Sequence, residues 1–141
     1  MSQRLSSEMV HATTVAKDGR GVVIAGRSGS GKSDLALRLI DRGFMLVSDD
    51  QTLICKSDGV LMASAPATIR GKIEVRGIGI LKLPNADSAA VSLWVDLANE
   101  IKRLPDGEQH RILGVDVPQI SLDAMTASAP IKVELALRMS A

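Results

Sequence analysis

The chain has 141 residues, a formal net charge of +1 and a single cysteine, Cys55. A chain of this length folds as one domain with its own core, so we expect one domain over residues 1–141, with a loosely ordered N-terminus over residues 1–9. The balanced charge argues against nucleic acid as the main partner, because nucleic-acid-binding domains are usually strongly basic. No apolar run is long enough to span a membrane, which argues against a membrane partner. A lone cysteine has no internal disulfide partner and predicts a reducing, cytoplasmic location.

The first two predicted elements are strands that pair with each other. Residues 10–16 are mostly apolar or β-branched, and residues 21–25 are again apolar and rich in valine and isoleucine. Between them, Asp18-Gly19 is a strong signal for a tight hairpin turn. This hairpin precedes the main motif of the chain and carries His11.

A phosphate-binding loop follows the second strand. The pattern G-x-x-x-x-G-K-[ST] is matched at every fixed position, and its chemistry needs glycines that let backbone N–H groups turn toward phosphate, a lysine for the phosphate charge and a hydroxyl for Mg²⁺. A serine- and glycine-rich surface loop is the alternative, but it leaves the lysine unexplained. The predicted nucleotide-binding residues are Gly26, Arg27, Ser28, Gly29, Ser30, Gly31, Lys32 and Ser33.

A helix and an acidic strand end come next. Residues 34–42 place leucine and isoleucine at helical spacing, and Gly43 stands where a helix-ending glycine belongs. Residues 44–47 then form an apolar run that ends in Asp49-Asp50. Acids at the end of a buried strand are typical of ligand sites in α/β sheets. Neighbouring side chains on an extended segment point to opposite faces, so we expect these two acids to have different roles.

The second half of the chain predicts shorter elements. Residues 51–55 and 60–63 flank a second Asp-Gly hairpin turn, residues 70–83 are rich in glycine and basic side chains, and residues 91–95 alternate as a strand. Residues 97–104 are either a short helix or a loop. Residues 112–122 predict one or two strands, with Pro118 at an edge or an end, and His110 is expected at the surface near a turn. The tail is ambiguous: apolar residues alternate from Ile131 to Met139 as in a strand, yet Pro130 suits a first helical turn.

Three features together resemble the catalytic, C-terminal domain of the bacterial HPr kinase/phosphorylase family. They are the loop from Gly26 to Ser33, the pair Asp49-Asp50, and the run Ile73-Glu74-Val75-Arg76-Gly77-Ile78-Gly79-Ile80. The resemblance extends from about Val10 to about Pro118 and corresponds to a short, single-domain form. It implies an α/β fold, namely a P-loop nucleotide-binding domain with a mixed sheet and β-hairpins. It also favours a helix for the tail.

The resemblance also implies an activity. Members of this family use ATP and Mg²⁺ to phosphorylate a serine of HPr, a phosphocarrier protein of the sugar phosphotransferase system, and form hexamers. We therefore expect a homo-oligomeric serine kinase acting on an HPr-like protein. The reverse phosphorylase reaction is left open, because residues 122–128 replace the proline-rich segment that the family uses for dephosphorylation.

Residue roles follow from the same resemblance. Lys32 is implied to contact the phosphates, and Asp49 to accept the proton of the attacking serine hydroxyl. The implied metal ligands are Ser33, Asp50 and Glu74, and the implied catalytic residues are His11, Lys32, Asp49 and Arg103. Several of these roles have a simpler alternative. Acids at a strand end are often solvated turn residues, a lone histidine such as His11 on a strand is more often a surface residue or one with its hydrogen bonds satisfied, and a glutamate among basic residues often forms a surface ion pair.

Two other functions remain open at this stage. A small-molecule kinase shares the phosphate loop, but such enzymes close an arginine-rich lid, and Arg38, Arg42 and Arg111 are not clustered in the sequence. A regulatory module that binds nucleotide without turnover is the second alternative, and the altered 122–128 segment is compatible with it.

Overall fold

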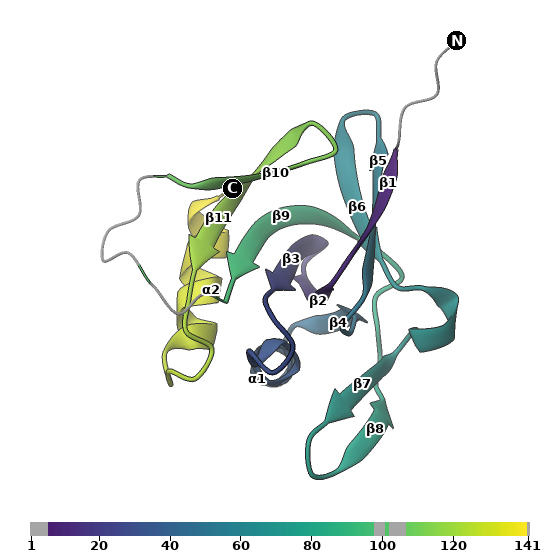
Figure 1. Ribbon diagram of the computed structural model, residues 1–141, viewed down its shortest axis with the longest axis vertical. Helices are drawn as coiled ribbons and strands as arrows, with labels where there is room; N and C mark the ends of the chain where they lie inside the picture. Colours follow the sequence, from purple (N-terminus) through teal and green to yellow (C-terminus); the bar gives the residue numbers. More distant parts are fainter. Residues whose placement is uncertain (1–5, 98–100, 102–106, 141) are drawn as a thin grey trace.

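The computed structural model describes residues 6–97, 101 and 107–140. Within them, a curved nine-stranded mixed sheet is joined by a separate two-stranded sheet and two α-helices (Figure 1). The elements are β1 (Ser7–Val10), β2 (Ala12–Lys17), β3 (Arg20–Ala25), α1 (Lys32–Asp41), β4 (Met45–Ser48), β5 (Thr52–Ser57), β6 (Val60–Ser64), a 3-10 turn (Ala67–Ile69), β7 (Lys72–Val75), β8 (Gly79–Lys82), β9 (Ala89–Asp96), β10 (Gln109–Ile112), β11 (Val115–Ser121) and α2 (Ala129–Met139).

The strand order places the phosphate-loop strand in the middle of the sheet. The order is β1-β5-β6-β9-β3-β2-β4, and β11 adds to β9 and pairs with β10. Strand β3 is antiparallel to β2 but parallel to β9, which is in turn parallel to β11. The C-terminal ends of β3, β9 and β11 therefore lie at one edge of the sheet, which is where ligands bind in α/β folds.

The predicted β2–β3 hairpin is present, with the expected turn. Asp18 and Gly19 have φ values of 53° and 76°. Two successive left-handed residues make the turn whose twist matches that of paired strands, and Asp-Gly is one of the sequences that adopts it most readily. The hairpin sets β2, and the polar side chains on it, next to β3.

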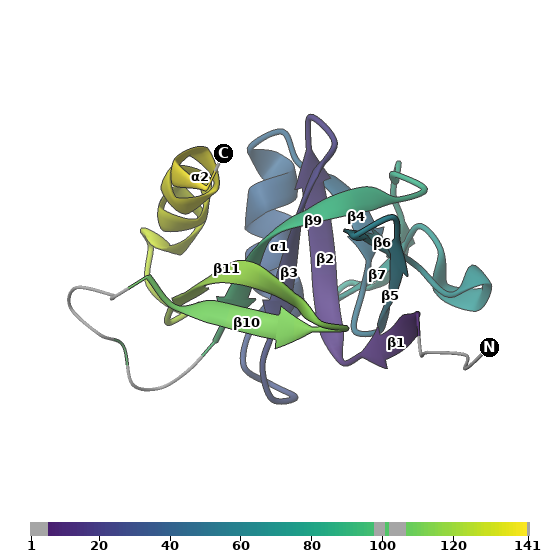
Figure 2. The ribbon, with the colours of Figure 1, turned by 90° about the horizontal axis from the view of Figure 1, so that it is seen from above.

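Both helices pack against one face of the sheet. Their apolar faces form one core cluster with alternate residues of the central strands, such as Val22 and Ile24 of β3, while the intervening Val23 packs into a second cluster on the opposite face. Figure 2 shows α1 and α2 side by side, with α1 directly behind β2 and β3. Among the described residues, no helix is long and apolar enough to cross a membrane.

The tail, which the sequence pattern left ambiguous, is a helix, as the family resemblance favoured. Pro130 lies in its first turn, and Val133 and Leu137, four residues apart, are buried against the core. Ile131, Leu135 and Met139 are exposed on the other side. Because apolar residues occupy both sides of α2, the sequence alternates as a strand would even though the backbone is helical.

Several details differ from the sequence-based expectations. Ser7–Val10 pairs with β5, so the prediction of a loosely ordered N-terminus is wrong for Ser7, Glu8 and Met9. The predicted strand over residues 10–16 is interrupted at His11, between β1 and β2. The glycine-rich stretch 70–83 forms a β7–β8 hairpin that extends beyond the main sheet (Figure 1). His110 is half-buried and stacks on Trp94, with 3.8 Å between ring centroids, because β10 folds back over the sheet.

Candidate active site

The phosphate loop connects the C-terminal end of β3 to the N-terminus of α1. Gly31 is the N-cap residue and has a left-handed φ of 98°, and its carbonyl accepts the first helical hydrogen bond, from the Leu35 N–H. The helix N-terminus carries unpaired N–H groups and the positive end of the helix dipole, so it favours an anion at this point. The loop thus has the geometry that its sequence predicts.

Two of its glycines are closely packed, and one of them, Gly31, also has a positive φ. A Cβ atom at Gly26 would lie 2.5 Å from Oγ of Ser30, and one at Gly31 would lie 3.0 Å from Cβ of Ala124. Oγ of Ser30 is itself buried and has no hydrogen-bond partner among the described residues. A buried hydroxyl without a partner is costly unless something else bonds to it, and a phosphate oxygen would do so. The loop therefore fits a nucleotide.

Lys32 is held over the loop by the loop's own carbonyls. Its Nζ donates to the backbone oxygens of Gly26 and Arg27, at 3.0 Å each, and the residue is buried. This position keeps the ammonium group above the loop, where phosphate oxygens can take over its hydrogen bonds. The predicted phosphate role of Lys32 is compatible with this geometry.

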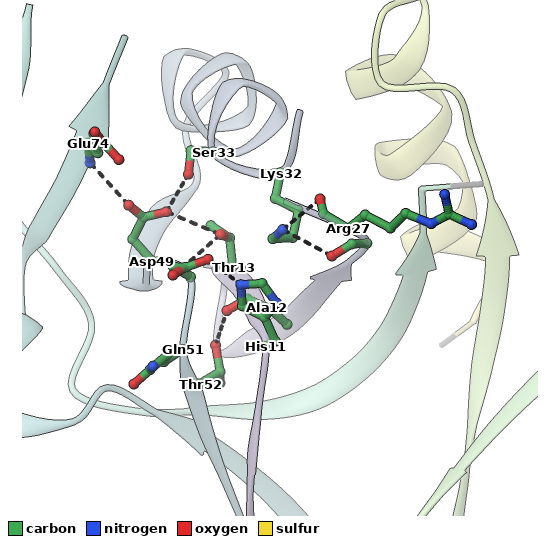
Figure 3. Close-up of polar contacts among 12 residues, drawn as sticks. His11, Ala12, Thr13, Arg27, Lys32, Ser33, Asp49, Gln51, Thr52 and Glu74 are labelled. Atoms are coloured by element: carbon green, nitrogen blue, oxygen red, sulfur yellow. Dashed lines mark hydrogen bonds and ion pairs between the residues drawn. The ribbon is translucent and has the colours of Figure 1, made fainter. Parts of the chain in front are cut away.

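Asp49 lies at the end of β4 and accepts hydrogen bonds from three different elements (Figure 3). Its Oδ1 accepts from Oγ of Ser33 at 2.5 Å and from Oγ1 of Thr13 at 3.1 Å, and its Oδ2 accepts from the backbone N–H of Glu74 at 3.0 Å. The residue is 9% exposed. Both carboxylate oxygens are therefore engaged, and the carboxylate is fixed beside the hydroxyl at the start of α1.

Asp50 has different surroundings although it is the next residue. Its Oδ1 lies 2.6 Å from Nε2 of His11, and the two side chains are 61% and 51% exposed. The backbone of Asp50 is left-handed, with φ of 68°, and its N–H donates to Oγ1 of Thr13 at 3.0 Å. The two acids do have different partners, as predicted, but the cause is this left-handed residue and not an extended segment.

The remaining predicted site residues are placed as follows. Glu74, on β7, reaches Asp49 through its backbone, and its own side chain is exposed. Arg103 lies outside the described residues. Thr13 was not predicted as a site residue. The signal that could have found it is its spacing from His11, since residues two apart on a strand share a face.

The segment that follows β11 lies beside the phosphate loop. Arg38 of α1 donates to the backbone carbonyls of Ala124 and Thr126, and Asp123 accepts from the N–H of Met125 at 2.9 Å. Together with the contact between Ala124 and Gly31, these bonds anchor the segment against the start of α1. The altered 122–128 stretch is therefore part of the wall of the site.

The donor set at Ser33 and Asp49 fits Mg²⁺. Both groups offer hard oxygen ligands and their oxygens are neighbours. Among the described residues, no group of three or more histidine, cysteine, aspartate or glutamate side chains is arranged to hold a metal. Mg²⁺ at nucleotide sites characteristically uses only one or two protein ligands and takes the rest from phosphates and water.

Comparisons with known proteins show the family to which the chain is similar. A family model described as "HPr Serine kinase C-terminal domain" matches residues 3–138. An HPr kinase/phosphorylase of Lactiplantibacillus plantarum is 38% identical over 133 residues, which cover 84% of this chain and 42% of that protein. The HPr kinase/phosphorylase of Caldicellulosiruptor bescii is 40% identical over 124 residues, covering 78% of this chain and 40% of that protein. The chain thus spans about two fifths of the length of these relatives.

A solved structure is similar over nearly the whole chain. The structure of the Hpr(Ser) kinase/phosphatase from Coxiella burnetii superposes with a TM-score of 0.81 at 31% identity, covering 94% of this chain and 89% of that chain. The family resemblance and the α/β fold with a mixed sheet that the sequence predicted are both confirmed.

Proposed function

This chain belongs to the HPr serine kinase C-terminal domain family, and we propose that it transfers the γ-phosphoryl group of ATP, with Mg²⁺, to a serine of an HPr-like phosphocarrier protein. The observation that carries the proposal is the joint placement of the phosphate loop and two differently bonded acids, Asp49 and Asp50, at one end of the sheet. Phosphoryl transfer needs a phosphate cradle, charge neutralisation and a group that handles the hydroxyl proton.

The backbone N–H groups of the loop and the ammonium of Lys32 bind the phosphates in this proposal. Ser33 and Asp49 supply the oxygen ligands for Mg²⁺, and the bound ion supplies neutralisation of phosphate charge. Asp49 suits this task because Ser33, Thr13 and the Glu74 N–H hold its carboxylate in one orientation. Glu74 remains a proposed second metal contact.

The geometry favours an exchange of the two roles expected for the acids. The acceptor positions of Asp49 are engaged by three donors, whereas Asp50 is exposed and bonded through its side chain to His11. A general base needs an accessible oxygen within hydrogen-bond reach of the substrate hydroxyl. We therefore assign proton acceptance to Asp50, with His11 orienting its carboxylate, and place Asp49 in the metal shell.

The transfer forms one bond to the γ-phosphorus and breaks another. The serine oxygen of the acceptor protein forms a bond to the γ-phosphorus, the bond from that phosphorus to the bridging oxygen breaks, and ADP leaves. The hydroxyl proton passes to Asp50. In the phosphorylase direction an oxygen of inorganic phosphate forms a bond to the phosphorus of phosphoserine, the bond from that phosphorus to the serine oxygen breaks, and pyrophosphate leaves. The protonated carboxyl of Asp50 returns its proton to the serine oxygen.

Further parts of the proposal come from the family resemblance and from the composition of the chain. Arg103 is retained as a catalytic candidate from the family resemblance. A cytoplasmic location, a hexameric assembly and the absence of nucleic-acid and membrane partners also stay predictions. Ala124 lies against Gly31 of the phosphate loop, so the segment 122–128 borders the site. The reverse reaction stays open, because this segment replaces the proline-rich one of the family.

The direct test is to incubate the chain with an HPr-type protein, ATP and Mg²⁺ and to look for phosphoserine by mass spectrometry. Lys32→Met is the control, because it keeps most of the aliphatic chain and removes the charge. ATP binding without phosphoserine would support a nucleotide-sensing module, and transfer to a small hydroxyl compound would support a small-molecule kinase. Serine-phosphorylated HPr with inorganic phosphate tests the reverse reaction.

A further inference from the structure

Thr13 connects the two acids of the site. It is fully buried in β2, 0% exposed, and its hydroxyl lies 3.1 Å from Oδ1 of Asp49 and 3.0 Å from the backbone nitrogen of Asp50. A backbone N–H can only donate, so the threonine oxygen accepts from Asp50. The single hydroxyl hydrogen is then free to be donated to the carboxylate of Asp49. Both bonds of this hydroxyl therefore have a defined direction.

The hydrogen bond from the N–H of Asp50 to the hydroxyl of Thr13 helps to hold an unusual backbone conformation at Asp50. Asp50 is left-handed, with φ of 68°, a conformation that is strained for a residue other than glycine unless its surroundings hold it. The N–H of Asp50 is held by Thr13, and the N–H of Gln51 bonds to the carbonyl of Asp49 at 2.8 Å. These two bonds maintain the bend that directs the Asp50 side chain to His11.

Strand alternation explains why Thr13 and not its neighbour has this position. Thr13, which pairs with Ile24 of β3, and Val15 lie on the face of β2 that α1 covers, whereas Ala12, Thr14 and Ala16 face the other way. Thr14 is equally buried, but its hydroxyl bonds to that of Thr52 at 2.9 Å. The chain thus holds two adjacent buried threonines, of which one reaches the site.

We propose that Thr13 is a positioning residue. It holds the carboxylate of Asp49, the proposed metal ligand, and the carboxylate of Asp50, the proposed proton acceptor, in fixed positions relative to each other. This inference rests on the proposed function. Thr13 contacts neither substrate nor metal and acts through the two acids. Without its hydroxyl, Asp49 loses one of the bonds that orient it toward Ser33, and the Asp50 N–H loses its acceptor.

The test compares Thr13→Val with Thr13→Ser and uses Thr14→Val as the matched control. The control makes the same change one residue away, and it leaves the Thr52 hydroxyl bonded to the Ala12 carbonyl. Each variant is measured for Mg²⁺-dependent binding of a non-hydrolysable ATP analogue by calorimetry, for transfer rate and for thermal unfolding. The binding measurement does not depend on turnover.

For Thr13→Val we expect the Mg²⁺ concentration at half-saturation to rise about tenfold and the transfer rate to fall about tenfold or more, because hydrogen bonds to charged groups and to buried N–H groups are lost. Thr13→Ser keeps both properties close to those of the unaltered chain, and so does Thr14→Val. If Thr13→Val does not fold, Thr13→Ala compared with Thr13→Ser separates the hydroxyl from the methyl group.

Two results would overturn the proposal: equal effects of Thr13→Val and Thr14→Val, or a loss in Thr13→Ser as large as that in Thr13→Val. Failure of the proposed function is distinguishable from both. An unaltered chain that transfers no phosphate to an HPr-type protein refutes that function, while the Mg²⁺-binding comparison still decides the positioning of Asp49 by Thr13.

Discussion

The hydroxyl of Ser33 donates a 2.5 Å hydrogen bond to the carboxylate of Asp49, joining the first turn of α1 to the end of β4. These two oxygens are the pair that nucleotide-binding domains use for Mg²⁺, one from the phosphate loop and one from a neighbouring strand. The bond is one of three that hold the carboxylate of Asp49 in place, and in the proposed mechanism Asp49 and Asp50 have different roles.

Replacing Asp49 tests its metal role. We expect Asp49→Asn to raise the Mg²⁺ concentration needed for half-maximal ATP binding by about tenfold or more, because an amide is a weaker ligand and presents one oxygen where the carboxylate has two. Calorimetric titration of Mg²⁺ with an ATP analogue measures this. Asp116→Asn is the control, since Asp116 forms an exposed ion pair with Arg111 away from the loop. Unchanged Mg²⁺ dependence combined with lost transfer would return the proton-acceptor role to Asp49.

Replacing Asp50 tests proton acceptance. Asp50→Asn keeps a side chain that can still bond to His11 but cannot take up the serine proton. We expect transfer to HPr to fall by about 10²–10⁴-fold, the usual contribution of a general base, with ATP and Mg²⁺ binding nearly unchanged. Steady-state kinetics and the same calorimetric titration measure the two properties. Transfer at the original rate in this variant would exclude Asp50 as the base.

Gly26 is expected to tolerate no side chain. In Gly26→Ala the new Cβ would lie 2.5 Å from Oγ of Ser30, so this hydroxyl must rotate out of its place in the loop. It would also lie 3.1 Å from Cβ of Leu97, so the loop and its neighbour must move apart by a few tenths of an ångström. Misplacement of reacting groups by about 1 Å can cost about a hundredfold in rate, and we expect a smaller loss from this smaller shift. Gly59→Ala is the control: it adds a methyl group at a left-handed residue with open space around it. That variant should lose stability while its ATP affinity stays the same, whereas Gly26→Ala should lose affinity and rate.

His110 is expected to make folding stability depend on pH. Burial beside Trp94 lowers the pKa of His110 from its ordinary value of 6.5, and the carboxylates of Glu8 and Asp96 act in the opposite direction. Between the lowered pKa and about pH 7 the unfolded chain binds more protons than the folded chain, so this residue makes the free energy of unfolding decrease as the pH falls. Above that window the contribution is constant.

The measurement for His110 is urea unfolding at a series of pH values, followed by circular dichroism. His110→Gln should show a flatter pH dependence across this window than the unaltered chain. Circular dichroism is preferable to fluorescence because the substitution also alters the surroundings of Trp94. Identical slopes in the two proteins would show that the stacked ring does not contribute.

The parts of the fold that the sequence predicted depend on neighbouring residues. The Asp18-Gly19 turn, the glycine loop before α1 and the stop at Gly43 each need particular backbone dihedral angles, which the residue types at those positions favour directly. The secondary structure of the tail was harder to predict from its alternating sequence, because α2 is apolar on two sides. Only the packing of Val133 and Leu137 against the core distinguishes a helix from a strand there. Motif residues and their approximate places were therefore predictable.

Only the tertiary structure determines which partners each polar group of the site has. Thr13, Ser33 and Asp49 come from β2, α1 and the end of β4, and they meet because the order and register of the strands bring them within hydrogen-bond distance. The sequence pairs Asp49 with Asp50 but contains no local signal that one carboxylate will be buried among three donors and the other left beside His11. Contacts between distant segments depend on how whole elements pack, and no short stretch of sequence specifies that packing.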